Sequence, residues 1–206
     1  MKELIKNALI LCAITMVAGL LLGTVYEVTK EPRKEQEEKA KQKSYAAVFE
    51  TADSFKIVDF DEKEVEKYID KAGISSNKAF VNEIVSANDK DGNSLGYVIT
   101  VTDKEGYGGE IKFAVGISNN AIVNGISILT INETAGLGMK AKESKFKKQF
   151  EGKKAETLVY TKNGASADNE IDAISGATIT TNAVTNGTNA AIYCFEYLTE
   201  GGELNE

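Results

Sequence analysis

Near its C-terminal end the chain reads Asp172-Ala173-Ile174-Ser175-Gly176-Ala177-Thr178, followed directly by Ile179-Thr180-Thr181. These small and hydroxyl-bearing residues precede a helix that the sequence predicts over residues 180–198. Such a loop can bring backbone N–H groups and hydroxyl oxygens to a phosphate, and the positive end of the helix dipole favours the same ligand. Ser, Thr and Asp are also the usual helix N-caps. The pattern alone therefore leaves a phosphate site and an ordinary cap both open.

The composition excludes several kinds of chemistry. Among 206 residues there is no histidine, there are two cysteines, and the formal net charge is −7. Without histidine the chain has no Ser-His-Asp or Cys-His catalytic group and no imidazole metal ligand. Two cysteines, Cys12 and Cys194, cannot hold a four-thiolate iron–sulfur cluster or a zinc ribbon. The negative charge argues against a nucleic-acid partner. A redox group on this chain would have to be organic.

A short tail, residues 1–6, precedes an uncharged segment at residues 7–26. As a helix this segment would be about 30 Å long, which matches the hydrocarbon core of a bilayer. Gly19 and Gly23 form a small-xxx-small pair that would let another transmembrane helix approach closely. No small-x-small cleavage site follows, which favours an uncleaved transmembrane helix over a signal peptide. Basic residues flank both ends, so charge alone does not decide the orientation.

Residues 27–53 are predicted to form a charged connecting helix, which Pro32 separates from the transmembrane segment. This helix becomes apolar at residues 46–49, where it can dock on a globular body. The globular domain is assigned to residues 54–206.

The globular domain begins with a predicted strand at residues 55–58 and a short helix at 61–69. Four further strands are predicted at residues 79–87, 97–102, 111–117 and 122–130. In the third of these, every second residue is large and apolar, which is typical of a strand with one buried face. Short turns join the strands, which predicts an antiparallel meander. A basic helix with a solvated face at 143–150 and a strand at 158–160 complete an α+β fold.

A second motif follows the meander and reads Glu133-Thr134-Ala135-Gly136-Leu137-Gly138. Its spacing fits neither a Walker loop nor a dinucleotide fingerprint. Taken together, the motif and the 172–178 stretch resemble the FMN-binding domain of the Rnf and Nqr electron-transport complexes, over about residues 96–198. The anchor, the charged helix and residues 46–50 also resemble the G subunit of the Rnf complex. The short chain favours that protein over the longer C subunit of the Nqr complex.

The resemblance implies an antiparallel-sheet FMN-binding domain with a covalent flavin, joined through its phosphate to the hydroxyl of Thr178. It also implies that a dedicated flavin transferase (ApbE-like) recognises the residues just before that threonine, which are Asp172, Ser175, Gly176 and Ala177. The upstream motif is expected to line the flavin pocket through Glu133, Thr134, Gly136, Leu137 and Gly138. Ala135 departs from the pattern, because a proline is common there. No catalytic residue and no metal ligand is expected.

By the same resemblance, the chain is expected to be a membrane-anchored electron-relay subunit of an ion-translocating ferredoxin:NAD+ oxidoreductase. Its partners would be the other membrane and peripheral subunits, the flavin transferase and the membrane, with no nucleic acid. It would span the cell (inner) membrane once, with its N-terminus cytoplasmic and its globular domain extracytoplasmic. It would catalyse no small-molecule reaction alone.

Three alternatives stay open. One is the C subunit of a Na+-translocating NADH:quinone reductase, and another is a free-standing extracellular FMN electron carrier. The third is a membrane-anchored, non-redox binding module in which Ser175 and Thr178 are only caps.

Overall fold

A computed structural model describes residues 1–200 of the chain. The chain divides into two compact units, residues 1–42 and the part from Lys43 onward. The first unit is helical throughout, and the second contains the sheet and all the other helices.

The helix α1 extends from Lys2 to Val48 and contains Pro32 in its interior. A separation at this proline is predicted from the sequence, but the structure continues the helix through it. Proline in a helix interior costs about 3 kcal/mol, a penalty that the strong helix formers on both sides can offset. An 18-residue window in the helix has a mean hydropathy of 2.4, so α1 is long and apolar enough to cross a membrane.

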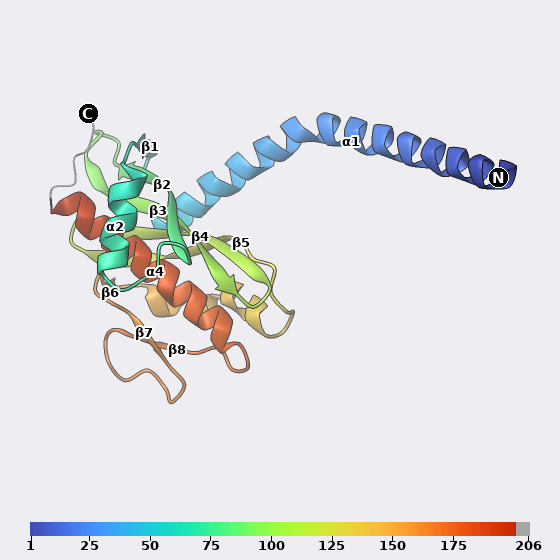
Figure 1. The fold of residues 1–206 in the computed structure, drawn as a ribbon. Coiled ribbons are helices and arrows are strands. Elements are labelled where there is room, and N and C mark those ends of the chain that lie inside the picture. The colour runs from blue at the N-terminus through green and yellow to red at the C-terminus, as the bar shows by residue number, and fades with distance from the viewer. Residues whose placement is uncertain (201–206) are drawn as a thin grey trace. The chain divides into compact units, whose positions relative to one another are not determined.

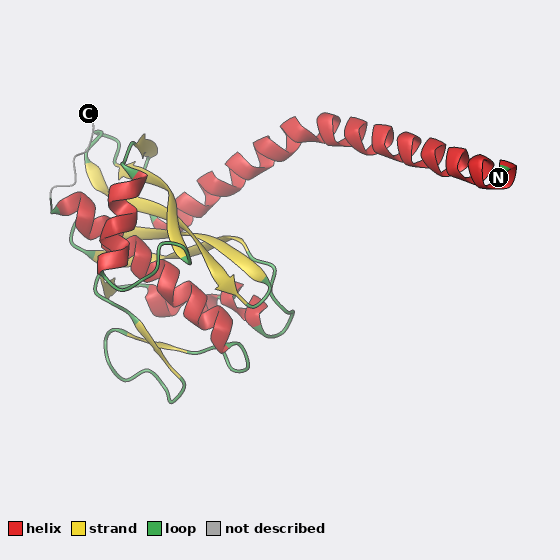
Figure 2. Cartoon of the chain, viewed as in Figure 1, coloured by secondary structure: helices red, strands yellow, loops and turns green. Residues whose placement is uncertain are grey.

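Six antiparallel strands form one sheet in the order in which they occur in the chain. They are β1 (Ser54–Val58), β2 (Ala79–Asn88), β3 (Ser94–Gly106), β4 (Gly109–Ser118), β5 (Ile122–Thr130) and β6 (Lys153–Lys154). Each of the first five pairs with the next strand along the chain, for example through Val101 opposite Phe113. The predicted meander is confirmed (Figure 2).

One face of this sheet is covered by α2 (Glu62–Lys71) and α4 (Thr178–Thr199) (Figure 1). The carboxylate of Asp61 caps α2 by accepting the N–H groups of Lys63 and Glu64. The centre of α4 contacts β4 closely, because a Cβ at Gly187 would lie 2.7 Å from the ring of Phe113. Glycine at this position therefore lets the helix lie directly on the core.

The other face of the sheet is covered by the end of α1. Tyr45, Val48 and Phe49 are buried against Val98 and Ala114. Of the residues predicted to dock, 46–49, Val48 and Phe49 are buried as expected, whereas Ala46 and Ala47 are exposed. This docking also explains why the compact unit begins at Lys43.

The chain between β5 and α4 is irregular. It contains η1 (Gly138–Lys142), α3 (Ser144–Lys147), η2 (Lys148–Phe150), β7 (Val159–Thr161) and β8 (Glu170–Asp172). The prediction of one regular helix at 143–150 is wrong, because Phe146 and Phe150 are both buried and the backbone tightens to a 3-10 turn to place them. Nothing in the local sequence pattern indicates that β7 and β8 pair in parallel.

Candidate functional site

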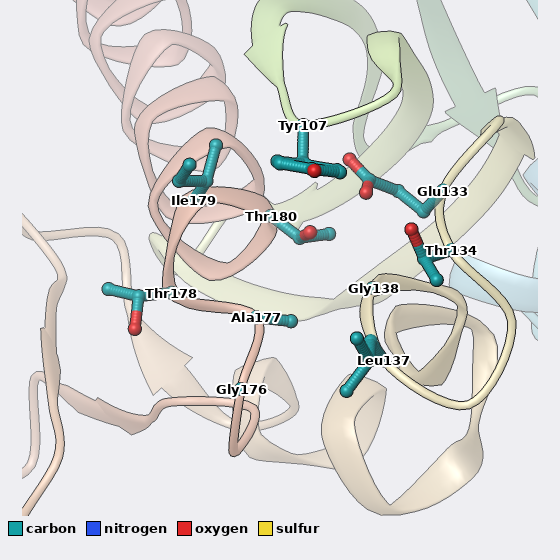
Figure 3. Close-up of a pocket in the computed structure, with 10 residues that line it drawn as sticks. All are labelled: Tyr107, Glu133, Thr134, Leu137, Gly138, Gly176, Ala177, Thr178, Ile179 and Thr180. Atoms are coloured by element: carbon teal, nitrogen blue, oxygen red, sulfur yellow. The ribbon is translucent and has the colours of Figure 1, made fainter.

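A cavity of about 560 Å³ opens where three segments meet (Figure 3). The segments are the tip of the β3–β4 hairpin, the loop after β5, and the start of α4. The residues that line the cavity are Tyr107, Glu133, Thr134, Leu137, Gly138, Gly176, Ala177, Thr178, Ile179 and Thr180.

The loop after β5 is held to the hairpin and folded on itself by hydrogen bonds. Oε1 of Glu133 accepts the N–H of Gly108 at 3.3 Å. The carbonyl of Thr134 accepts the N–H groups of Leu137 at 3.1 Å and Met139 at 3.2 Å. Gly136 has a φ of +77° within this turn, a conformation that favours glycine. Gly136 therefore shapes the loop although it does not line the cavity.

Gly138 lies where this loop meets α4. A Cβ on Gly138 would be 2.6 Å from Oε2 of Glu133 and 2.6 Å from Oγ1 of Thr180. Real Cβ atoms essentially never come this close to other atoms, so only glycine lets the loop lie against the helix without a shift. This contact joins the two motifs of the sequence into one site.

The start of α4 lacks a side-chain cap. Its N-cap residue is Ala177, and Gly176 before it has a φ of +77°. Within residues 1–200, no partner is found for the N–H groups of Thr178, Ile179 and Thr180. An open helix N-terminus of this kind is suited to an anion.

The hydroxyl groups of Ser175 and Thr178 make no hydrogen bond within the described residues. The interpretation of these two residues as ordinary caps therefore lacks the hydrogen bonds that it requires. The loop is fixed instead by Thr181, whose Oγ1 accepts the N–H of Ile174 at 3.0 Å and donates to the carbonyl of Ala177 at 3.0 Å.

Thr178 and Thr180 point in different directions (Figure 3). The hydroxyl of Thr178 is partly exposed and points away from Leu137 and Gly138, toward the outside of the first helical turn. Thr180 points toward the loop after β5, and its Oγ1 is buried without a hydrogen-bond partner in the described chain. Thr178 is thus the more accessible of the two hydroxyl groups.

The structure brings seven of the ten predicted site residues to the cavity: Glu133, Thr134, Leu137, Gly138, Gly176, Ala177 and Thr178. Asp172, Ser175 and Gly136 are not among its lining. Asp172 instead organises the approach to the motif, because its Oδ1 accepts the N–H of Ala165 at 2.5 Å. Its backbone N–H donates to Oε1 of Gln149 at 2.6 Å, and Nε2 of Gln149 donates to its carbonyl at 3.3 Å.

Three lining residues were not predicted from the sequence: Tyr107, Ile179 and Thr180. Tyr107 is 71% exposed between Gly106 and Gly108. A Cβ on Gly108 would be 1.8 Å from the carbonyl oxygen of Asn132, so the hairpin tip and the loop after β5 touch through their backbones. The feature of the sequence that could have identified Tyr107 as a site residue is its position as an aromatic residue between two glycines in a turn. Ile179 and Thr180 simply continue the 172–178 motif.

Asp103 lies at the base of the same hairpin and is fully buried. Its Oδ1 accepts the N–H of Glu105 at 2.7 Å, while its Oδ2 has no hydrogen-bond partner in the described part of the chain. Burial, reinforced by the charge of Glu105, raises the pKa of Asp103 to about 7. A buried ionisable group therefore supports the hairpin that carries Tyr107.

The family of FMN-binding domains matches residues 106–193, and the family described as the RnfG N-terminal region matches residues 1–48. The crystal structure of NqrC from Shewanella oneidensis has a similar fold, with a TM-score of 0.51 at 18% identity, covering 72% of this chain and 86% of that one. The fold, the cavity and these matches define the class: an FMN-binding domain with an N-terminal anchoring helix.

Comparison with full-length proteins identifies the family within this class. The G subunit of the Na(+)-translocating ferredoxin:NAD(+) oxidoreductase complex of Acetobacterium woodii is 32% identical over 201 residues, which cover 97% of this chain and 95% of that protein. The G subunit of the proton-translocating complex of Clostridium ljungdahlii is 29% identical over 187 residues, covering 91% and 87%. The chain belongs to the G-subunit family of ion-translocating ferredoxin:NAD(+) oxidoreductase complexes.

The residues of the cavity fit FMN. Its volume lies within the usual range of small-molecule sites, roughly 300–1,000 Å³. Tyr107, Leu137 and Ile179 offer exposed apolar and aromatic surface of the kind that a planar ring system covers. The open N–H groups at the start of α4 suit a phosphate.

Proposed function

We propose that this chain carries FMN joined through its phosphate to Oγ1 of Thr178, and that it relays electrons within a membrane-bound complex that couples ferredoxin and NAD+ to ion translocation. Family membership supports the role in such a complex. The observation that carries the linkage is the position of Thr178: a partly exposed hydroxyl at an open helix N-terminus, beside a cavity of suitable size.

The residues around Thr178 have separate tasks in this proposal. Ser175 and Gly176 are small and exposed, so a flavin transferase of the ApbE-like kind can reach the hydroxyl. The N–H groups of the first turn of α4 stabilise the charge that the phosphodiester keeps. Gly176 approaches Leu137, whose Cδ2 would lie 3.1 Å from a Cβ at that position, so a larger residue would crowd the cavity entrance.

The cavity walls orient and shield the ring. Tyr107, Leu137 and Ile179 remove apolar surface from water when they cover it, and each is substantially exposed otherwise. Glu133 lines the cavity and is held by the N–H of Gly108, so its carboxylate would oppose a build-up of negative charge on a flavin bound there. FMN, when bound, supplies the capacity to accept two electrons and to release them singly.

We further propose the orientation of the chain: one membrane span, the N-terminus in the cytoplasm and the flavin domain outside it. A covalent bond suits that side, where a lost cofactor could not be replaced. The other subunits of the complex would supply and remove the electrons, and this chain alone would turn over no small molecule.

The linkage is tested by Thr178→Val in a host that contains the flavin transferase. The unaltered chain is expected to give a fluorescent flavin band on a denaturing gel and an intact mass increased by one FMN less water. Thr178→Val is expected to lose both signals, while its circular dichroism spectrum stays unchanged. Thr199→Val, the same substitution at the other end of α4, should keep both. A fluorescent Thr178→Val band would refute the assignment.

The second candidate is the C subunit of a Na(+)-translocating NADH-quinone reductase. The Pasteurella multocida protein of that name is 46% identical over 71 residues, but they cover only 31% of this chain and 27% of that protein. The local match supports a shared flavin site, and the full-length match favours the G subunit. Co-purified subunits that reduce NAD+ with ferredoxin would decide for the first candidate. Isolation without membrane partners would favour a free-standing carrier.

A further inference from the structure

The charge of the chain is unevenly distributed. Residues 138–154 contain seven lysines and two glutamates, a net charge of +5. The whole chain has a formal charge of −7, so the remaining residues together carry −12. The positive charge is concentrated in one short segment of an acidic protein.

Five of these lysines, which we call the lysine platform, make no ion pair anywhere in residues 1–200: Lys140, Lys142, Lys145, Lys147 and Lys148. Elsewhere in the segment, Lys154 approaches Glu156 at 3.9 Å between two well-exposed side chains, and Lys153 donates to the carbonyl of Asp168. The described chain therefore supplies no direct ion-pair partner for the five lysines of the platform.

The segment that carries the platform is anchored in the core by buried residues. Phe146 and Phe150 are buried and pack edge to face with their ring centroids 5.5 Å apart. Ala141 is also fully buried. The lysines are thus presented from a fixed scaffold, which lowers the entropic cost of binding a partner.

The segment that carries the platform is also connected at each end to one of the two motifs of the candidate site. Its η1 turn begins at Gly138, which lines the cavity. Gln149, which follows Lys148, binds the backbone of Asp172 just before the 172–178 motif. The segment that carries the lysines is therefore tied to both motifs of the candidate site.

We propose that the lysine platform is the docking surface for an acidic protein surface that exchanges electrons with the flavin. The inference rests on the proposed function. Opposite charge on the partner raises the rate of encounter and sets its orientation.

A protein surface is favoured over an anionic membrane by the residues between the lysines. A segment that lies in a membrane surface needs an apolar face exposed to the lipid. Here the two aromatic side chains of the segment, Phe146 and Phe150, are directed into the protein core. The exposed apolar residues lie instead around the cavity, where electrons would pass.

The test uses native membranes that contain the assembled complex, treated with a carbodiimide that joins lysine amines directly to carboxylates. Mass spectrometry is expected to find links from Lys142, Lys145 or Lys148 to aspartates or glutamates of another polypeptide. Lys56 in β1 and Lys90 in the β2–β3 turn serve as controls, because they lie at the end of β3 opposite the hairpin. These two should give at most about a tenth of the inter-chain links.

A matched set of variants tests whether the platform affects the rate at which the reduced flavin is reoxidised. Lys145→Gln with Lys148→Gln is expected to slow reoxidation of the reduced flavin in these membranes about threefold to tenfold at low salt, and to weaken its dependence on ionic strength. Lys145→Arg with Lys148→Arg should restore the rate, and Lys56→Gln with Lys90→Gln should leave it unchanged. In-gel flavin fluorescence should be equal in all of them, which separates failure of this proposal from failure of the covalent linkage.

Three results would overturn the proposal. Inter-chain links from the platform that are no more frequent than those from Lys56 and Lys90 would exclude a protein partner there. An unchanged rate in the Gln pair would do the same. Protection of Lys145 and Lys148 from acetylation in nanodiscs of phosphatidylglycerol, but not in nanodiscs of phosphatidylcholine, would assign the platform to lipid headgroups.

Discussion

The meander β2–β5 and the irregular segment between β5 and α4 differ in how their backbones are held in place. The strands of the meander are 9 to 13 residues long, are paired along their length, and bury Ile99, Phe113 and Ile117 completely. The irregular segment has strands of two and three residues, and its loops are held by glycines and by single side-chain-to-backbone hydrogen bonds. The first region depends on apolar burial along paired strands, whereas the second joins buried anchors such as Phe150, Leu158 and Ile171 by individual polar contacts.

Because of this difference, substitutions in the two regions should affect different properties of the protein. The meander, α4 and the buried anchors of the irregular segment share one apolar core, and the upstream flavin motif and most of the 172–178 motif lie in the irregular segment. Substitutions of core residues in the meander should therefore lower the free energy of unfolding. Substitutions of the polar residues of the irregular segment should disturb flavin attachment more than they disturb stability.

The largest expected effect is that of Phe113→Ala. The side chain is fully buried between the sheet and Gly187 of α4, so truncation removes apolar contacts and leaves a cavity. The free energy of unfolding should fall by about 3–5 kcal/mol. It can be measured by urea denaturation of the full chain in mild detergent, followed by the near-ultraviolet circular dichroism of the tyrosines.

Ile57→Ala is the control for this change. Ile57 lies in the edge strand β1 and is 72% exposed, so the loss should stay below about 0.5 kcal/mol. A loss of similar size in both variants would show that burial in the meander does not dominate the stability of the domain.

The second prediction concerns Asp103, the buried acid of the meander. Its folded-state pKa of about 7 lies above the ordinary value of 3.8, so between these values the folded chain keeps a proton that the unfolded chain releases. The contribution of Asp103 to stability should therefore fall as the pH rises from about 4 to about 7, by at most about 4 kcal/mol. Asp103→Asn should remove this decline, which denaturation at a series of pH values can measure.

The asparagine keeps the shape of the side chain and an oxygen that accepts the N–H of Glu105. Lys78, which pairs with Glu105 at 2.7 Å, acts in the opposite direction on the pKa of Asp103 and is retained in the variant. If the unaltered chain and Asp103→Asn show the same slope of stability with pH, burial does not control the protonation of Asp103.

The meander could be predicted from sequence because its causes are local. Alternating apolar residues at 111–117 and short polar turns set both the strands and their antiparallel order, and the structure confirms them. Residues 143–150 could not be predicted in the same way. Their helical pattern is real, but burial of two aromatic rings decides the backbone.

The residues of the candidate site that belong to the two sequence motifs could be predicted. The 172–178 stretch and Glu133–Gly138 identify most of the cavity lining, and the contact at Gly138 brings them together. Tyr107 could not be placed, because its position depends on the backbone approach between Gly108 and Asn132 across the fold. The hydrogen bonds between Gln149 and Asp172 could not be predicted either, because the two residues are 23 positions apart in the sequence.

Apart from the control variants, the smallest expected effect on stability is that of Gln149→Ala, which tests how the attachment loop is held in place. Its side chain makes two hydrogen bonds to the backbone of Asp172, at 2.6 and 3.3 Å, in a partly exposed setting. Losing them should lower the free energy of unfolding by only about 1 kcal/mol. The loop that leads to Thr178 would lose its connection to η2, however, so flavin attachment should slow several-fold.

In-gel flavin fluorescence measured against time after induction of the transferase gives that rate, and urea denaturation gives the stability. Lys148→Ala removes a neighbouring exposed side chain that makes no hydrogen bond in the described chain, so it should change neither quantity. The prediction would be contradicted if Gln149→Ala lowered the free energy of unfolding by several kcal/mol but left the rate of flavin attachment unchanged. The irregular segment would then support the fold, and the geometry of the attachment loop would not depend on this link.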